Sequence, residues 1–223
     1  MNIVIPLGTG TKWQNNELRY CLRGIEMYCK DADNIVIVGE KPEWITNILH
    51  IPAKDAHSPT LSIWNKVLLA AKCHEVSEDF FFCNDDYFWL SEFTFKDYPY
   101  YYTDVTGNSP YKKILRRTMD VCRKSGLTAL NYDVHKPMII NKALFQETYE
   151  FFSWHLPIDQ GLVMKSCYCN LQGVTGEWMQ DKKLFRGNNI PEAGMFSISD
   201  DFIDQSFKYY CSQRWPEKSK YEI

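Results

Sequence analysis

The hydrophobic positions of this chain form short apolar runs that alternate with longer amphipathic segments. A strand buried on both faces of a sheet reads as a continuous apolar run, whereas a helix repeats its apolar positions about every 3.6 residues. The runs predict strands at 3–7, 35–38, 48–51 and 80–83, with a strand or lid-like segment at 98–102. The periodic segments predict helices at 15–29, 62–74, 110–126, 141–152, 158–170 and 202–210.

This alternation of strands and helices indicates an α/β protein with a mostly parallel sheet and helices on both faces. Right-handed crossovers gather the carboxyl ends of such strands at one edge. We therefore expect Gly8, Gly39 and the Asp85-Asp86 pair to face one crevice. At 223 residues, of which 45% are hydrophobic, the chain can form one large domain over 1–223.

The segment Phe80–Phe88 carries the clearest chemical signal. Its apolar run ends abruptly in Asn84, Asp85 and Asp86, and aromatic residues follow at once. Two acids at the end of a buried strand can hold Mg²⁺ or Mn²⁺ through oxygen ligands, and the cation can neutralise a diphosphate. The alternative is a plain turn, in which Asn84 and Asp85 supply the turn chemistry.

A glycine-containing loop follows the first predicted strand. Gly8-Thr9-Gly10 is half of a dinucleotide fingerprint without its third glycine, so it indicates only a loop that a nucleotide can approach closely. Lys12 follows the loop, and Arg19 and Arg23 lie one helical turn apart, where they could bind the phosphates. The alternative is a solvated helix face on which Arg23 pairs with Glu26.

His135 stands two residues before Pro137, in a segment that should be extended. A histidine held there could act as a general base, a metal ligand or a phosphate partner. Asp133 is the second candidate for the base. The alternative is that His135 has only a structural role.

The net charge of −3 argues against general binding of polyanions, but the charge is uneven. One short segment contains the basic residues Lys112, Lys113, Arg116, Arg117, Arg123 and Lys124. The first four are candidates for contact with a phosphate-bearing acceptor, and Asp159, at a predicted helix start, is a further acceptor contact. The alternative is an ordinary charged surface helix.

Composition also bears on location and on binding. No apolar run approaches the ~20 residues needed to span a bilayer, and the first seven residues are too short for a signal peptide, so a cytoplasmic protein is expected. The eight cysteines lack paired spacing and are expected to be reduced. The seven tryptophans could stack on sugars, but they are spread evenly along the chain.

Three separated motifs resemble, in order, those of the Stealth family, which comprises hexose-1-phosphate transferases of capsule synthesis and the lysosomal N-acetylglucosamine-1-phosphotransferase subunit. The three motifs are Asn16–Glu26, Asn84–Phe88, and His135–Pro137 followed by Ile139–Lys142, and the match also runs through Ile35–Val38 and Pro42–Trp44. The resemblance covers most of residues 15–145. The family's N-terminal signature is replaced here by Ile5–Gly10, and its C-terminal block is not found. The chain is therefore closer to the short relatives in bacteria and their phages, which look like glycosyltransferases of the GT-A class.

The resemblance implies a GT-A-like, Rossmann-type fold and a metal-dependent glycosyltransferase. The donor would be a nucleotide sugar, in the first place a UDP-sugar, bound by the half 1–105. The hydroxyl acceptor, a carbohydrate or a hydroxymethylated DNA base, would be bound by the half 106–223. Asp85 and Asp86 would hold the metal, and His135 would be the base. Two alternatives stay open: a hexose-1-phosphate transferase that releases a nucleoside monophosphate, and a non-catalytic carbohydrate-binding module.

Overall fold

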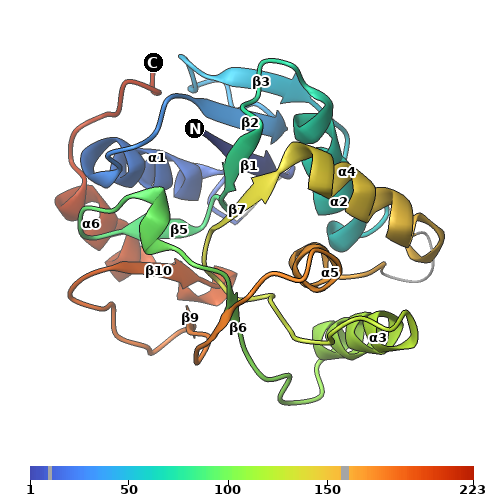
Figure 1. Ribbon diagram of the computed structural model, residues 1–223. Coiled ribbons are helices and arrows are strands. Elements are labelled where there is room, and N and C mark those ends of the chain that lie inside the picture. The colour runs from blue at the N-terminus through green and yellow to red at the C-terminus, as the bar shows by residue number, and fades with distance from the viewer. Residues whose placement is uncertain (10–11, 157–160) are drawn as a thin grey trace.

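The structure is a computed structural model that describes residues 1–9, 12–156 and 161–223 (Figure 1). The helices are α1 Asn16–Tyr28, α2 Pro59–Lys72, α3 Pro110–Lys124, α4 Lys142–Phe152, α5 Met164–Leu171 and α6 Gln205–Arg214. The strands are β1 Asn2–Leu7, β2 Ile35–Gly39, β3 Leu49–Pro52, β4 Asp79–Phe82, β5 Tyr87–Trp89, β6 Tyr101–Tyr102, β7 Met138–Asn141, β8 Glu177–Trp178, β9 Lys183–Leu184 and β10 Met195–Ile198.

The central sheet has five strands in the order β3-β2-β1-β4-β7. The first four run parallel, and β7 pairs antiparallel with β4. The prediction of a mixed α/β fold with a mostly parallel sheet is therefore confirmed. Because the parallel strands point the same way, the carboxyl ends of β1 and β4 lie at the same edge.

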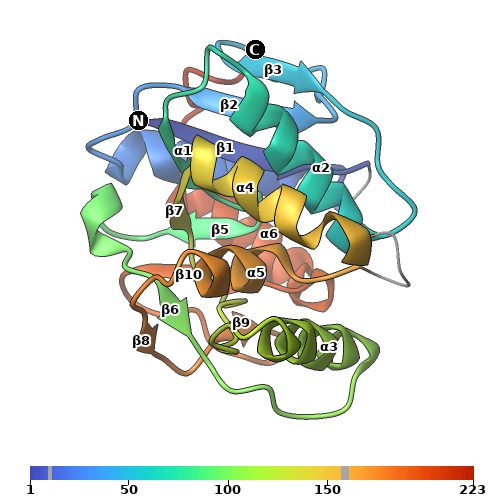
Figure 2. The same ribbon diagram turned by 45° about the vertical axis from the view of Figure 1, so that its right-hand side comes forward.

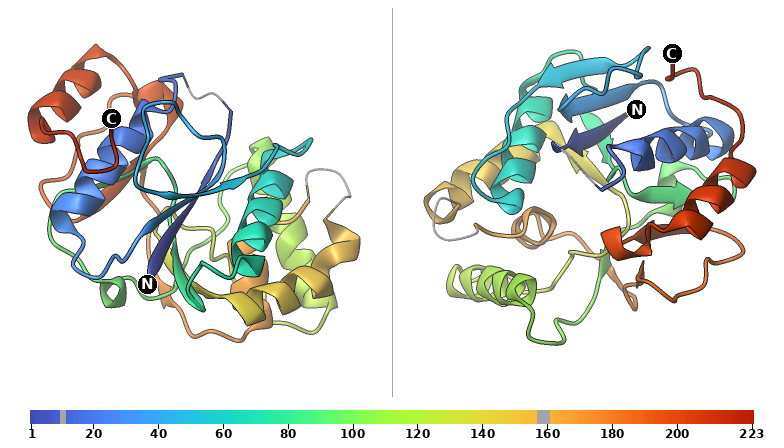
Figure 3. Two further views of the ribbon diagram at one scale, coloured as in Figure 1. Left: turned by 90° about the horizontal axis from the view of Figure 1, so that it is seen from above. Right: turned by 180° about the vertical axis from the view of Figure 1, so that it is seen from behind.

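Helices cover both faces of this sheet, as predicted (Figures 2 and 3). Alternate residues of a strand point to opposite faces, and the apolar runs supply a hydrophobic residue to each. On β1, Ile3 and Ile5 are buried in the cluster that contains α1, whereas Val4 is buried in the cluster that contains α2 and α4. Each fully buried aliphatic side chain contributes about 1.5–3 kcal/mol, so this alternation fixes the register of the sheet.

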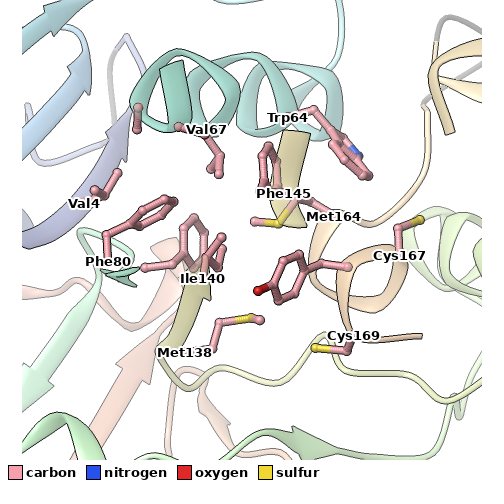
Figure 4. Packing of buried hydrophobic residues seen from close by; sticks show 14 of the residues in the cluster. Val4, Trp64, Val67, Phe80, Met138, Ile140, Phe145, Met164, Cys167 and Cys169 are labelled. Carbon is pink, nitrogen blue, oxygen red and sulfur yellow. The ribbon is translucent and has the colours of Figure 1, made fainter. Parts of the chain in front are cut away.

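The core beneath α2 and α4 is aromatic and reaches to α5 (Figure 4). Trp64 is fully buried against Phe145, with ring centroids 5.6 Å apart, and its indole nitrogen donates to the carbonyl of Leu162 over 2.7 Å. Phe80 and Ile140 face each other across the antiparallel β4–β7 pair. The core therefore ties the segment around residue 162 to the sheet.

A second, three-stranded sheet has the order β5-β10-β9. β10 pairs antiparallel with β5 and parallel with β9, which places Ser197 opposite both Tyr87 and Lys183. The turn after β4 therefore carries the chain from one sheet directly into the other. This arrangement brings residues 180–200 next to the acidic pair, which is more than ninety positions earlier in the chain.

The predicted elements differ from the observed ones at several boundaries and in several strands. α2 begins at Pro59, earlier than predicted, because Ser58 accepts a hydrogen bond from the amide of Leu61 and the proline occupies the first turn. α5 begins at Met164, and residues 157–160 of the predicted helix 158–170 lie outside the described residues. Strands β5, β7, β8, β9 and β10 were not predicted. In the described ranges, no helix is long and apolar enough to cross a membrane.

Candidate functional site

The candidate site lies at the carboxyl edge of the central sheet, where the turn after β4 joins the two sheets. The thiol of Cys83 and the buried ring of Tyr87 bracket the turn, so burial fixes both of its ends. Asn84, Asp85 and Asp86 between them are half-buried. The local sequence therefore folds as predicted, with the acidic pair immediately after a buried strand.

A cavity of about 450 Å³ lies on one side of this turn and is lined by Gly8, Thr9, Asp55, Lys66 and Asp85, among others. Thr9 donates to Asp55 from its amide over 3.1 Å and from its hydroxyl over 3.0 Å. The hydrogen bond from Lys66 is the main cause that lowers the pKa of Asp55. The loop after β1 is thus held by side chains from two other segments.

The ammonium group of Lys66 is buried beneath this cavity. It donates to the carbonyl of Leu7 over 2.7 Å and pairs with Asp55. Gly39 has a φ of 124°, and a Cβ there would lie 2.1 Å from the Leu7 oxygen and 2.9 Å from Lys66 Cε. Only glycine fits that position, so Gly39 supports the cavity floor and does not reach a ligand itself.

Asp85 and Asp86 sit in an electrostatic environment that favours a cation. Burial, followed by the nearby charges of Asp86 and Glu17, raises the pKa of Asp85 to about 7. Asp86 accepts from Ser197 over 2.9 Å and from Lys183 over 3.0 Å through the same oxygen, Oδ2. Its other oxygen, Oδ1, is buried and has no hydrogen-bond partner among the described residues.

These two carboxylates are suited to a particular kind of metal site. Across the described ranges, no cluster of three or more His, Cys, Asp or Glu side chains could hold an ion by itself. Mg²⁺, however, is often bound by one or two carboxylates, and it takes its other ligands from water and a substrate phosphate. The unpartnered Oδ1 of Asp86 and the repulsion at Asp85 fit such a cation.

A second cavity, of about 440 Å³, lies on the other side of the turn. It shares Ile63 and Asn84 with the first cavity, so the two adjoin at the acidic turn. His135 lines it, and His135 Nδ1 lies 2.7 Å from Asp181 Oδ2. The amide of His135 donates to the other oxygen of Asp181 over 2.9 Å, so one carboxylate grips both the ring and the backbone.

Asp181 is suited to orienting this histidine. Burial by itself would raise the pKa of its carboxyl, but the hydrogen bond and charge of His135 outweigh burial and lower it. An ionised Asp181 accepts a hydrogen bond from Nδ1–H, so Nε2 is the ring nitrogen that carries the free lone pair. His135 lies in a bend, where the amide of Lys136 donates to the carbonyl of Val134 over 2.7 Å, so the expectation of an extended segment is wrong. The contact with Asp181 nevertheless orients the imidazole, which lines the cavity.

Buried hydrogen bonds also fix the segment around His135. The ammonium group of Lys165 donates to the carbonyl of Lys136 over 2.9 Å and to that of Val134, one on each side of the histidine. Asp133 lines the same cavity, but its Oδ2 accepts from the hydroxyl of Tyr111 over 2.6 Å. The structure thus brings Asp133 and His135 together, with His135 better oriented by its partners.

The expectation that Arg19 and Arg23 bind phosphates is wrong. Both guanidinium groups engage the buried carboxylate of Glu222, Arg19 over 2.9 Å and Arg23 over 2.7 Å. Arg23 also donates to the carbonyl of Trp215 over 2.7 Å. They hold the C-terminal segment against α1, and the alternative pairing of Arg23 with Glu26 is not the one observed.

The remaining candidates divide into three groups. Lys12 is exposed and lines none of the cavities described here. Gly10 and Asp159 lie outside the described residues. Of the basic residues on α3, Lys112 lines the second cavity.

Four other basic residues of α3, Lys113, Arg116, Arg117 and Lys124, line a separate groove together with Asp120. Arg117 donates to the carbonyl of His155 over 3.2 Å. Arg116 donates to the carbonyl of Gly107. Two of the four predicted acceptor contacts thus also fasten α3 to neighbouring loops.

Sequence reasoning missed four residues of the site: Asp55, Lys66, Asp181 and Lys183. Lys66 had a signal, since it interrupts the apolar stripe of a predicted helix next to Val67. Asp181 and Lys183 had none, because their positions depend on the pairing of β9 with β10. A comparison with models of known protein families finds no match to this chain, and a comparison with curated proteins finds none either.

Proposed function

We propose that this protein is a metal-dependent transferase that uses a nucleotide-sugar donor and moves the sugar to a hydroxyl acceptor. One observation carries the proposal: an acidic turn with uncompensated negative charge separates two adjoining cavities, and the second contains an oriented histidine. Perturbed carboxylates in a cleft are typical of functional sites. A donor and an acceptor each need a cavity, and the reacting bond must lie between them.

The first cavity suits the nucleotide of the donor. Gly8 and Thr9 are exposed at its edge, and the absence of a Cβ at Gly8 lets a flat base or ribose approach the backbone. Asp55 and Lys66 keep this loop in place. The arginines of α1 bind Glu222 instead, so the negative charge of the diphosphate would be neutralised by a cation that the acidic turn holds.

Asp85 and Asp86 would hold Mg²⁺ or Mn²⁺ at the junction of the two cavities. A cation bound there would stabilise the negative charge that develops on the departing nucleotide. Lys183, which contacts Asp86 at 3.0 Å, is a second positive group for that charge. Both features favour cleavage next to a diphosphate over simple sugar binding.

His135 would accept the proton of the acceptor hydroxyl through Nε2. Asp181 fixes the ring and stabilises the imidazolium that forms. Such general-base catalysis contributes about 10²–10⁴-fold to a rate. Lys112, Asp133 and Tyr111 line the same cavity and are available to bind the acceptor.

Product analysis tests the proposal directly. Purified protein is incubated with UDP-, GDP- and CDP-sugars and Mn²⁺, and the nucleotides are separated by ion-exchange chromatography. Release of a nucleoside diphosphate that stops when a chelator is added is the expected result. Release of a nucleoside monophosphate would instead indicate transfer of a sugar phosphate. A protein that binds glycans but neither binds nor cleaves any donor would be a carbohydrate-binding module.

A further inference from the structure

The second cavity opens into a third, outer cavity of about 680 Å³, whose occupant the site described above does not explain. The two share His135, Asp181, Lys112, Lys183 and Phe185, so they are continuous. The outer cavity adds Thr103, Asp104, Thr106, Trp178 and Gln180. A ligand that reaches His135 from outside would therefore lie along these residues.

Trp178 is the dominant side chain of the outer cavity. It is 56% exposed, although burial of an indole is strongly favoured. Its indole nitrogen donates to Asp104 Oδ2 over 3.3 Å, so the exposed ring has a defined orientation. Phe185, which is 53% exposed, lines the same cavity.

Trp178 lies on strand β8, which pairs with β6; Figure 2 shows both strands on the α3 side of the molecule. Tyr102 pairs with Trp178, and the amide of Met179 donates to the carbonyl of Tyr102 over 2.9 Å. A Cβ on Gly176, the residue before β8, would lie 2.6 Å from the ring of Tyr132, so only glycine lets the backbone at this point pack against that ring. Backbone hydrogen bonds from Glu177 and Met179, the residues before and after Trp178, thus fix its backbone at the edge of the cavity.

The charge of the outer cavity argues against a polyanion. Two aspartates, Asp104 and Asp181, balance two lysines, Lys112 and Lys183. The groove along α3 is different, since four basic residues line it against Asp120 alone. Nucleic acid binding depends on an excess of positive charge, which this cavity lacks.

We infer that the outer cavity is an acceptor subsite for a carbohydrate chain of at least two sugar units, in which a sugar ring stacks on Trp178. An aromatic face with hydroxyl, carboxylate and amide side chains around it matches the apolar face and the hydroxyl groups of a sugar ring. This inference rests on the proposed function, since it names the acceptor class of the same site. It selects carbohydrate over modified DNA.

The test compares binding by two exposed tryptophans. Fluorescently labelled protein is applied to a printed array of defined glycans, and the dissociation constant of each glycan that binds is measured by calorimetry. Trp178→Ala is expected to weaken binding about tenfold or more, whereas Trp178→Phe retains most of it. Trp154→Ala is the matched control, because Trp154 is 87% exposed on the turn Ser153–His155 after α4.

The outcomes separate this inference from the transferase proposal. Glycan binding that Trp178→Ala leaves unchanged would overturn the subsite, as would the absence of any bound glycan. Binding of a short single-stranded oligodeoxynucleotide in place of glycans would assign the acceptor to the polyanion class instead. Nucleotide-sugar binding is measured separately, so a protein that binds glycans through Trp178 but no donor would keep the subsite and lose the transferase.

Discussion

Two charge clusters of opposite electrostatic character adjoin helix α1 of this protein. In the C-terminal clasp, formed by Arg19, Arg23 and Glu222, two guanidinium groups surround one buried carboxylate. Their hydrogen bonds outweigh burial and lower the pKa of Glu222 to about 2. In the acidic turn, burial and the charge of Asp86 raise the pKa of Asp85 to about 7.

The difference separates a charge cluster that stabilises the fold from one for which we propose a function. The carboxylate of the clasp has its partners within the chain, so the cluster is complete and stabilises the fold. The acidic turn has more negative charge than its neighbours neutralise, and Asp86 Oδ1 has no partner among the described residues. Such a deficit costs stability and persists where a ligand supplies the missing charge.

The largest effect should come from Asp86→Asn, which halves the charge of the acidic turn but keeps its shape. We expect donor cleavage to fall by about 10³-fold, because the cation loses a carboxylate ligand and the leaving nucleotide loses the cation that stabilises its charge. Turnover is measured as nucleotide release at saturating Mn²⁺. Glu92→Gln, at an exposed ion pair with Lys30, is the matched control and should keep full activity. Undiminished turnover in Asp86→Asn would remove the acidic turn from the mechanism.

The next effect concerns the orientation of His135. Asp181→Asn should reduce transfer to an acceptor about 10²-fold, because the amide no longer fixes Nδ1 as the protonated nitrogen. Donor binding, followed by calorimetry, should be unchanged, since Asp181 lines the second cavity and not the first. Asp120→Asn, on the exposed side of α3, is the control. Equal losses in binding and transfer would mean that Asp181 supports the fold and not the histidine.

In the clasp, the expected effect is on stability. Glu222→Gln should lower the free energy of unfolding at pH 7 by about 3 kcal/mol, which corresponds to a pKa that falls from 4.5 to about 2 on folding. A depressed carboxyl pKa stabilises the fold fully above pH 4.5, and the contribution disappears as the pH falls toward 2. Urea unfolding at pH 7 and pH 3 should therefore show a large difference between wild type and variant only at the higher pH. Glu217→Gln, at an exposed position nearby, should match wild type at both.

The same contrast explains how far the sequence could be read. The apolar runs predicted β1 to β4 and the acidic turn after β4 correctly, because a strand buried on both faces needs apolar residues at consecutive positions. The sequence also singled out His135, which lines the second cavity, although the conformation expected from the nearby proline is not the observed one. These features are local, so one segment of sequence contains the whole signal.

Features that depend on distant pairing were missed or misread. Arg19 and Arg23 look like phosphate ligands until Glu222, about two hundred residues away, is placed between them. Asp181 looks like an ordinary loop aspartate until β9 pairs with β10. No local pattern records either contact, and both depend on how the second half of the chain packs against the first.

The smallest predicted effect is the pH dependence that Asp85 gives to stability. Its pKa rises from 3.8 unfolded to about 7 folded, so its ionisation opposes folding. This cost is absent below pH 3.8, grows as the pH rises toward 7 and is complete above it. Because the side chain is only half-buried, solvent screening reduces the cost to about 2 kcal/mol.

Asp85→Asn should therefore unfold at a higher urea concentration than wild type at pH 8, in buffer with a chelator, and at the same concentration at pH 4. Mg²⁺ should reduce the difference in urea midpoint between variant and wild type at pH 8, because a cation bound between the two carboxylates neutralises the repulsion that the substitution removes. If Asp85→Asn raised the urea midpoint by the same amount at both pH values, the stabilisation would come from packing. The acidic turn would then lack the excess negative charge that distinguishes it from the clasp.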